Sequence, residues 1–489
     1  MHTRIATTAL AISLIPFSMA RADECATTRY EVSYKGDDNF EVAVHFTPSS
    51  QNVTTFSYED VSGQLTLDDY FSDVTVSMSD GPGSPLSNVD LGNWRMPEQF
   101  VGKEVVLRYR VTAKQDEASW PFGQEEVGHH FDEGFYFVGY SIFLADEANE
   151  SCDAVVDFDL PSGWGVHAPW TQMTPMRFET ASLERLQRNG FTVGPNIGSQ
   201  TVKIGERSFT FVYEEALKTT AVEAQTAASG LSAHFVDLFG GAPESDYFIF
   251  LAADDKPGGG AFADSFGQRF VTPVRPEEKV VWLHGFAHEF IHRWLGHGIR
   301  FENETDLEWF QEGVTDYLTI KGLFATGAID EVELEKKLEN SIRRYLLALR
   351  FGGPMSFAEA GKEKARNRMM IYGGGAVFSL LLDAELSSQK GPGAFEGFLS
   401  ELYAGRDTHY SYADILERMN TISDGHAGEI LEGLEHGMRA SDIASNLSPH
   451  DVRLASFMEE VYITFGEAGC ARKNPTCVPA FLRNKENSR

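Results

Sequence analysis

One short segment, HGFAHEFIHRWLGH at residues 284–297, concentrates four histidines and a glutamate. From Pro276 onward the apolar residues recur with the 3.6-residue period of a helix. Proline suits the first turn of a helix, two glutamates follow it near the positive helix end, and Gly296 is a stop signal. The sequence therefore predicts a helix over residues 276–296 that carries most of these polar side chains.

The four histidines of this segment are not equivalent. His288 and His292 are four residues apart, so they share one helix face and can bind one tetrahedral ion. Glu289 is turned by about 100° around the helix, where it can reach a metal-bound water without binding the metal. We expect His284 to be structural, and His297 to lie at the rim of a pocket or on the surface. The pattern is typical of a hydrolase metal site.

The third ligand is expected in EWFQEGVTDY, on the next predicted helix, where Glu312 follows His292 with a loop between the two helices. A catalytic zinc takes three protein ligands and keeps one position open. Asp316, one helical turn after Glu312, can accept the outer N–H of a ligating imidazole, although a solvated role fits it equally well. We therefore predict one Zn²⁺ ion held by His288, His292 and Glu312.

These motifs resemble those of the gluzincin metallopeptidases, which share HExxHxWxG and WxxEGxxxY. FYFVGYSIFLADE and LPSGWGVHAPW also resemble the β domain that precedes the catalytic domain in the glycyl aminopeptidase family. Together the similarities cover roughly Tyr30 to Met438. The resemblance implies a thermolysin-like catalytic domain, first β and then mainly α, and a peptide or protein substrate.

The family also uses a tyrosine some sixty residues beyond the glutamate ligand, in a Y-x-x-G-A context. MMIYGGGAVFSLLLDAEL matches this pattern, with Tyr372 in the tyrosine position. The resemblance implies that Tyr372 stabilises an oxyanion, and a phenol is a suitable donor for that purpose. A buried packing tyrosine is the alternative.

The segment GAFAD departs from the related aminopeptidases, which carry G-x-M-E-N or G-G-x-E-H on a strand before the zinc helix. Ala263 stands where the glutamate that binds the substrate's N-terminal ammonium belongs. Asp264 is one residue further, and because side chains alternate along a strand it faces the wrong way unless the glycine-rich turn shifts the register. Candidate substrate contacts are Gly259, Gly260, Ala261 and Asp264, since the glycines would let a substrate backbone approach closely; a plain flexible turn is the alternative for the glycines. Cleavage at the N-terminus or inside a peptide stays open.

The chain as a whole is predicted to be a multidomain α+β protein. Period-two alternation from Tyr30 to about Leu160 predicts an antiparallel, sandwich-like β domain, and SFTFVYEE and YFIFLAA predict further strands before the helices begin. The predicted divisions are a signal peptide (1–22), an N-terminal β domain (23–204), the catalytic domain (205–440) and a C-terminal helical tail (441–489).

Residues 1–22 combine a basic start, an apolar run and the cleavage signal Ala20-Arg21-Ala22, which predicts export to the periplasm or the extracellular space. No later run looks long and apolar enough to cross a bilayer, so membrane insertion is not expected. The net charge of −31 disfavours nucleic acid and anionic lipid as partners.

The four cysteines suit disulfides in an exported chain. Cys470 is expected to pair with Cys477, and Cys25 with Cys152, although other pairings remain possible.

The sequence thus favours a secreted zinc metallopeptidase in which Glu289 is the general base and Tyr372 binds the oxyanion. Two alternatives remain at this stage. One is a peptide-binding protein that keeps zinc but has lost turnover, against which the intact Glu289 argues. The other is a non-peptidase zinc hydrolase on the same scaffold.

Overall fold

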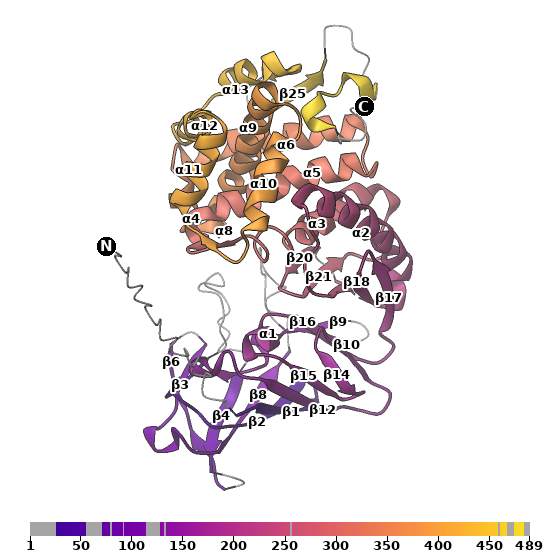
Figure 1. Cartoon of the computed structure of the whole chain (residues 1–489). Coiled ribbons are helices and arrows are strands. Elements are labelled where there is room, and N and C mark those ends of the chain that lie inside the picture. Colours follow the sequence, from indigo (N-terminus) through magenta and orange to yellow (C-terminus); the bar gives the residue numbers. More distant parts are fainter. Residues whose placement is uncertain are drawn as a thin grey trace, which may run out of the picture.

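The computed structural model describes residues 26–54, 71–78, 81–90, 92–113, 128–131, 134–254, 257–457, 460–466 and 474–483. Within these ranges β sheets form the N-terminal part and helices form most of the remainder (Figure 1). The predicted α+β class is therefore confirmed. The predicted signal peptide lies outside the described residues and stays a prediction.

The N-terminal part contains three sheets among the described residues. The largest has, in spatial order, β14 (Thr171–Thr174), β15 (Arg177–Thr180), β12 (Ala154–Asp159), β1 (Thr28–Gly36), β2 (Asn39–Phe46), β8 (Val105–Thr112), β4 (Phe71–Ser77) and β5 (Ser84–Pro85). The second has β13 (Gly165–His167), β16 (Gly190–Gly194), β10 (Gly134–Val138) and β9 (His129–Phe131). The third has β11 (Ala145–Asp146), β3 (Asn52–Thr54), β7 (Asn93–Arg95) and β6 (Ser87–Asp90).

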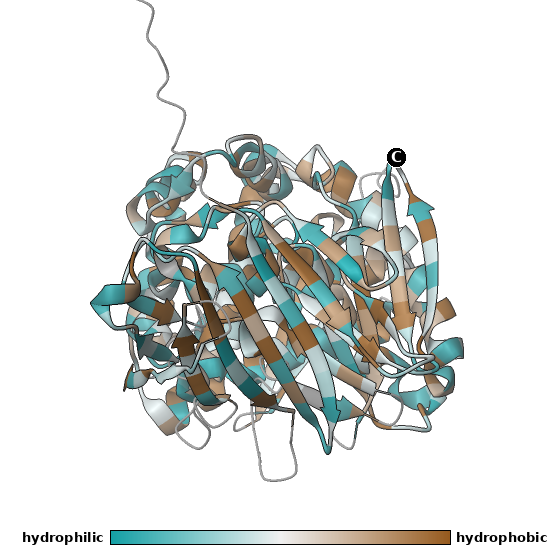
Figure 2. Ribbon diagram, turned by 90° about the horizontal axis from the view of Figure 1, so that it is seen from below, coloured by the Kyte–Doolittle hydropathy of each residue, from teal (hydrophilic) through white to brown (hydrophobic). Residues whose placement is uncertain are grey.

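The first two sheets pack face to face, as the predicted sandwich requires. Phe40 of β2 lies with its ring centroid 5.0 Å from that of Phe135 on β10, and Phe158 of β12 lies 6.0 Å from Phe191 on β16. Figure 2 looks onto the outer side of the large sheet, where hydrophilic and hydrophobic residues alternate along the strands. This alternation is the period-two pattern of the sequence.

One strand pair departs from the predicted antiparallel arrangement. β1 and β12 are parallel, with Thr28 opposite Ala154. A parallel pair needs a long crossover connection, and the many residues between these two strands supply it. Alternation within a strand predicts which face is buried, but it does not predict the direction of the neighbouring strand.

A five-stranded sheet links the β part to the helices. Its order is β17 (Gly198–Ile204), β18 (Arg207–Tyr213), β19 (Tyr247–Ala253), β21 (Ser265–Phe270) and β20 (Gly258–Ala261). Ile249 and Leu251 face the helical core, whereas Phe250 faces the N-terminal core, where its ring lies 5.6 Å from that of Tyr136. Because both faces are covered, the two parts pack as one body (Figure 1).

The predicted boundary between residues 204 and 205 is wrong. It falls inside the hairpin of β17 and β18, in which Ile204 pairs with Arg207. The change from one set of sheets to the next lies between Gly194 and Gly198 instead. Both sides of the true boundary alternate with period two, so the periodicity does not mark it.

Short connections join the helices along the chain. Two further short strands, β22 (Arg300–Phe301) and β23 (His409–Tyr410), pair with each other. The helices are α1 (Leu183–Gln187), α2 (Lys218–Phe239), α3 (Lys279–Ile291), α4 (Glu304–Glu308), α5 (Thr315–Ala325), α6 (Glu331–Gly352), α7 (Phe357–Gly361), α8 (Lys364–Arg368), α9 (Gly375–Lys390), α10 (Ala394–Ala404), α11 (Tyr412–Ile422), α12 (His426–Glu435) and α13 (Ala440–Leu447). The predicted helix over 276–296 is mainly α3, which ends at Ile291, before the predicted stop.

The C-terminal tail, predicted to be helical, contains a β hairpin in the structure. After α13 the chain forms a hairpin of β24 (Val452–Phe457) and β25 (Glu460–Phe465). The hairpin packs on α6, where the Ile463 amide donates to Glu339 at 2.7 Å. VYITF alternates apolar and polar residues and is rich in β-branched and aromatic side chains, which favours a strand.

One helical run, Lys364–Lys390, is long and apolar enough to cross a membrane, contrary to the expectation from the sequence. However, 83% of its most apolar window is buried inside the protein. Its composition is therefore that of a core helix.

Cys152 and Cys477 are both disulfide-bonded, but Cys25 and Cys470 lie outside the described residues, so the predicted pairing stays a prediction.

Candidate metal centre

The last turn of α3 holds the first two candidate ligands. His288 lies inside the helix and His292 is its C-cap, and both are buried. Their Nε2 atoms are 3.2 Å apart. The opposite face of α3 is anchored in the core, where Phe286 stacks against Phe290 and packs edge-on against Phe266. Apolar packing of the helix thus fixes the direction of both imidazoles.

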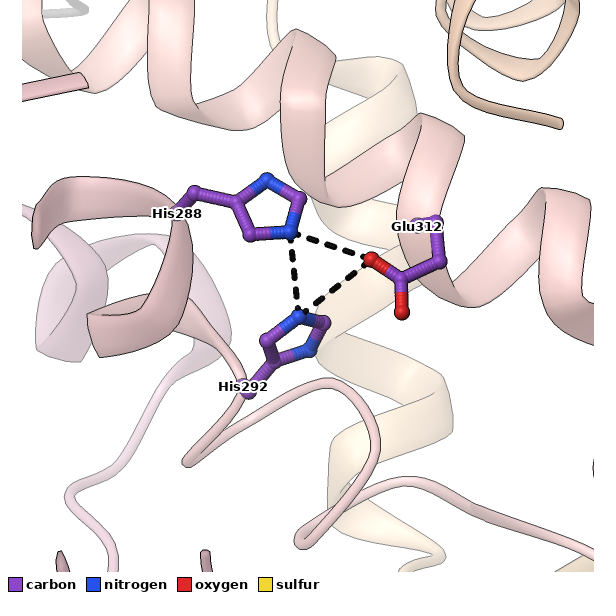
Figure 3. Close-up of side chains that lie close together, drawn as sticks. All are labelled: His288, His292 and Glu312. Carbon is purple, nitrogen blue, oxygen red and sulfur yellow. Dashed lines mark hydrogen bonds and ion pairs between the residues drawn. The ribbon is translucent and has the colours of Figure 1, made fainter. Parts of the chain in front are cut away.

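Glu312 completes the cluster from a π-helical turn, Trp309–Val314. Its Oε2 atom lies 3.0 Å from Nε2 of His288 and 3.5 Å from Nε2 of His292 (Figure 3). Donors around a tetrahedral zinc with bonds of about 2.0–2.2 Å stand roughly 3.3–3.6 Å apart. The three atoms therefore have nearly the spacing that one zinc ion requires.

Outer hydrogen bonds orient both imidazoles. Nδ1 of His288 donates to Oδ1 of Asp316 at 3.0 Å, and Nδ1 of His292 donates to the carbonyl of Leu295 at 3.0 Å. With the proton on Nδ1, each Nε2 can offer a lone pair to a metal ion. Asp316 therefore lies against a candidate ligand, and its second oxygen accepts from Arg344 at 2.9 Å.

A lysine holds the other oxygen of the glutamate ligand. Nζ of Lys364 lies 2.8 Å from Oε1 of Glu312 and 2.6 Å from Glu308. This leaves Oε2 of Glu312 for the metal ion. Lys364 was not predicted, because it comes from α8, beyond the long helix α6, and no spacing rule connects it to the motif.

The charges of the site suit a cation. Burial raises the pKa of Glu312, but Lys364 and the imidazoles lower it well below its usual range. Burial also raises the pKa of Asp316, but hydrogen bonds from His284 and His288 outweigh this effect and lower the pKa below its usual range. Burial lowers the pKa of His288, yet the two carboxylates raise it to about 10. The acids are ionised, and the field between them favours positive charge.

Tyr372 lies beside the ligands on a second π-helical turn, Met369–Gly374. Its ring stacks on that of His288, with centroids 5.7 Å apart. The π-helical turn of Glu312 meets the start of α9, where a Cβ atom on Gly375 would lie 2.8 Å from the Cα of Gly313 and overlap the carbonyl oxygen of Trp309. Glycine at this contact therefore lets the tyrosine approach the metal centre.

Two arginines surround this phenol. Arg368 donates to the hydroxyl of Tyr372 at 3.4 Å, and the guanidinium carbons of Arg344 and Arg368 lie 5.2 and 4.9 Å from its ring centroid. Burial and the charge of Glu312 hold the pKa of Tyr372 well above its usual value. The phenol keeps its proton at neutral pH. Arg368 precedes Tyr372 by one helical turn, so the sequence did contain a signal for it.

The remaining polar residues of the segment 284–297 take different positions. Glu289 is half-buried, and burial raises its pKa although the two neighbouring imidazoles oppose the rise. His284 lies 3.4 Å from Asp316 and outside the ligand triangle. His297 is exposed, and its ring lies against the backbone of Ala261.

The predicted substrate contacts lie on and after β20, which packs against α3. Gly259, Gly260 and Ala261 form part of this strand and are half-buried. Asp264 lies in the turn that follows, and its carboxylate accepts from Nε of Arg185 on α1 at 3.0 Å. The glycine strand therefore borders the metal helix, whereas the aspartate binds the N-terminal part.

Comparison with known families decides the assignment. Residues 282–352, which include His288, His292 and Glu312, match the model of the M61 glycyl aminopeptidase family. This chain is a gluzincin-like zinc metallopeptidase. Zinc is assigned to the metal centre through the similarity of these residues to this family. The matched range ends before Tyr372, so it does not bear on the tyrosine.

Solved structures show the fold of this metallopeptidase. An aminopeptidase N family protein from Idiomarina loihiensis has a TM-score of 0.73 at 16% identity, over 88% of this chain and 79% of that chain. An M1 zinc metallopeptidase from Deinococcus radiodurans, solved as a variant bound to a Tyr-Ser-Ala substrate, has a TM-score of 0.55 at 16% identity, over 85% and 94%. No curated protein sequence matches the chain.

Proposed function

We propose that this metallopeptidase hydrolyses peptide bonds and does not require a free N-terminus on its substrate. The observation that carries the catalytic part is the placement of Tyr372 against His288, beside a complete ligand triangle. A peptide carbonyl at this point would have a base on one side and a phenol donor on the other.

Different residues of the chain would carry out the separate steps of the hydrolysis. When bound, zinc acidifies a water and polarises the scissile carbonyl. Glu289 takes the proton from the attacking water and delivers it to the leaving amine. Tyr372 donates its phenol hydrogen to the carbonyl oxygen as negative charge develops there, while Arg368 contacts the phenol oxygen from outside. His288, His292 and Glu312 hold the ion in place.

The second part of the proposal concerns the substrate's N-terminus. Apart from Glu289, the acids described around the centre are bound by cations: Glu308 and Glu312 by Lys364, Asp316 by Arg344 and Asp264 by Arg185. An ammonium anchor needs a carboxylate that is available to the substrate. This pairing supports recognition through the peptide backbone, for which β20 offers an outer strand edge.

A matched pair of peptides tests the proposal. A hydrogen bond to a charged group contributes about 1.5–3 kcal/mol, so an ammonium anchor should favour a free peptide over its acetylated form by roughly 10- to 150-fold in kcat/KM. We expect a ratio below about 10. Chelation should abolish both activities and added zinc should restore them. Cleavage of free peptides alone would contradict the second part, and a zinc-loaded protein that cleaves neither peptide would contradict the first.

Tyr372→Phe should lower kcat by about 10²- to 10³-fold, because the variant loses the donor to the oxyanion and keeps the ring. Zinc content should not change, since the tyrosine stacks on a ligand and does not bind the ion. Steady-state kinetics with metal analysis checks both points. Tyr462→Phe, on the exposed C-terminal hairpin, is the matched control. A Tyr372→Phe rate equal to wild type would show that another group holds the oxyanion.

We also propose that the protein is exported to the periplasm or the extracellular space after removal of a signal peptide near Ala22. Residues 1–22 have the composition of a signal peptide, and Cys152 and Cys477 are disulfide-bonded, as an oxidising compartment allows. Fractionation of cells expressing the full chain, with N-terminal sequencing of the product, tests this. Recovery of the uncleaved chain in the cytoplasm would contradict it.

A further inference from the structure

The strand β20 forms the outer edge of the five-stranded sheet. It pairs with β21 through Gly258 opposite Arg269 and Ala261 opposite Phe266, and no strand pairs with its other edge among the described residues. It also packs against α3, which carries the histidine ligands. If the proposed function holds, the position of β20 relative to α3 sets where a substrate backbone lies.

The turn after β20 is fastened by the N-terminal part. Oδ1 of Asn189 accepts from the Asp264 amide at 2.9 Å and from the Ser265 hydroxyl at 3.0 Å. The Ser265 hydroxyl in turn accepts from the Gly190 amide at 2.9 Å. Within the turn, the Phe262 amide donates to the Ser265 carbonyl at 2.7 Å. The end of β20 is therefore tied to the start of β16 as well as to its own sheet.

An ion pair closes the same connection. Nε of Arg185 donates to Oδ2 of Asp264 at 3.0 Å, and the side-chain amide of Asn189 donates to the Arg185 carbonyl at 3.0 Å. The Asp264 side chain is 8% exposed and that of Arg185 is 49% exposed. Removal of the arginine would leave a buried carboxylate without its cation, which the turn can relieve only by moving toward water.

These contacts reach no metal ligand. They bind the backbone at the end of β20, and Figure 1 shows α1 and β16 directly beneath β20 and β21. Asp264 directly follows Ala263, at the end of GAFAD. In this chain it serves the connection between the two parts.

We infer that the N-terminal β part positions the substrate-facing strand through a turn clamp, defined here as Arg185 and Asn189 bound to Asp264 and Ser265. Arg185 is thus a positioning residue for peptide binding, and the inference rests on the proposed function. The clamp gives the β part a role in catalysis without a side chain in the metal centre. Loosening it should weaken substrate binding and spare the chemical step.

Arg185→Ala tests the clamp against Arg188→Ala, a change on the same segment that removes a partner of Glu184. In Arg185→Ala, backbone amides of residues 257–264 should exchange with deuterium about tenfold faster than in wild type, measured by mass spectrometry. KM should rise about tenfold, while kcat and zinc content stay within about twofold of wild type. Arg185→Lys, which keeps a cation, should recover part of both losses. Arg188→Ala should match the wild type.

Each outcome separates the clamp from the proposed function. Equal exchange and equal KM in Arg185→Ala and Arg188→Ala would overturn the clamp. A wild type without peptidase activity would refute the proposed function, and the exchange measurement would still decide whether the clamp holds β20. Should Arg185→Ala fail to fold, Asp264→Asn removes the buried charge and takes its place. Wild-type exchange in Asp264→Asn would also overturn the inference.

Discussion

Glu289→Gln is expected to lower kcat by about 10²- to 10⁴-fold, the contribution typical of a general base. The amide has the shape of the carboxylate but cannot take the proton of the attacking water. Because Glu289 lies outside the ligand triangle, the variant should keep its zinc. Peptide assays together with metal analysis of the purified protein measure both quantities.

Glu277→Gln is the matched control, since Glu277 is exposed and lies just before α3. It should have wild-type kcat and zinc content. Turnover by Glu289→Gln at the wild-type rate would refute the assignment of the base. Loss of zinc along with activity would show instead that Glu289 supports the metal centre. Zinc in a wild type without turnover would favour the peptide-binding alternative over an enzyme.

Gly375→Ala is expected to destabilise the protein by about 1–3 kcal/mol or more and to lower kcat by at least roughly tenfold. The added Cβ would lie 2.8 Å from the Cα of Gly313 and overlap the carbonyl oxygen of Trp309. Both obstacles are backbone atoms, which cannot rotate away. The π-helical turn of Glu312 and the start of α9 would have to separate, and Tyr372 would then move away from Glu312. Thermal unfolding and steady-state kinetics measure the two effects.

Gly397→Ala is the control for this change. Gly397 lies within α10, and a Cβ atom there would meet nothing within 4 Å. The substitution should leave stability unchanged or raise it by up to about 1 kcal/mol, because alanine favours a helix. Equal stability of Gly375→Ala and Gly397→Ala would show that the contact tolerates a side chain, and the positioning of Tyr372 would need another explanation.

Local spacing was sufficient to find the metal ligands. His288 and His292 are related by one helical turn, and Glu312 and Asp316 by another, so the relevant geometry lies within single helices. Their relative placement follows once the two helices pack. Tyr372 was predicted from a family pattern, and in the structure its ring stacks on that of His288.

Contacts between distant segments could not be predicted in this way. Lys364 reaches Glu312 across 52 residues, and Arg185 reaches Asp264 across 79. Each is one basic residue among many on an amphipathic or polar segment, and nothing in its neighbours marks its partner. The parallel pairing of β1 with β12 was missed for the same reason, because strand partners are chosen by the packed sheet.

The sequence by itself determined the class of the fold and the metal ligands, because helical and strand periods and motif spacings are local properties of the chain. The tertiary structure decided which cations hold the acids, how closely the tyrosine approaches and where Asp264 binds. Those features depend on backbones that meet at Gly313 and Gly375 and on charges buried between the two parts. Burial makes such pairings strong, and burial exists only after the chain has packed.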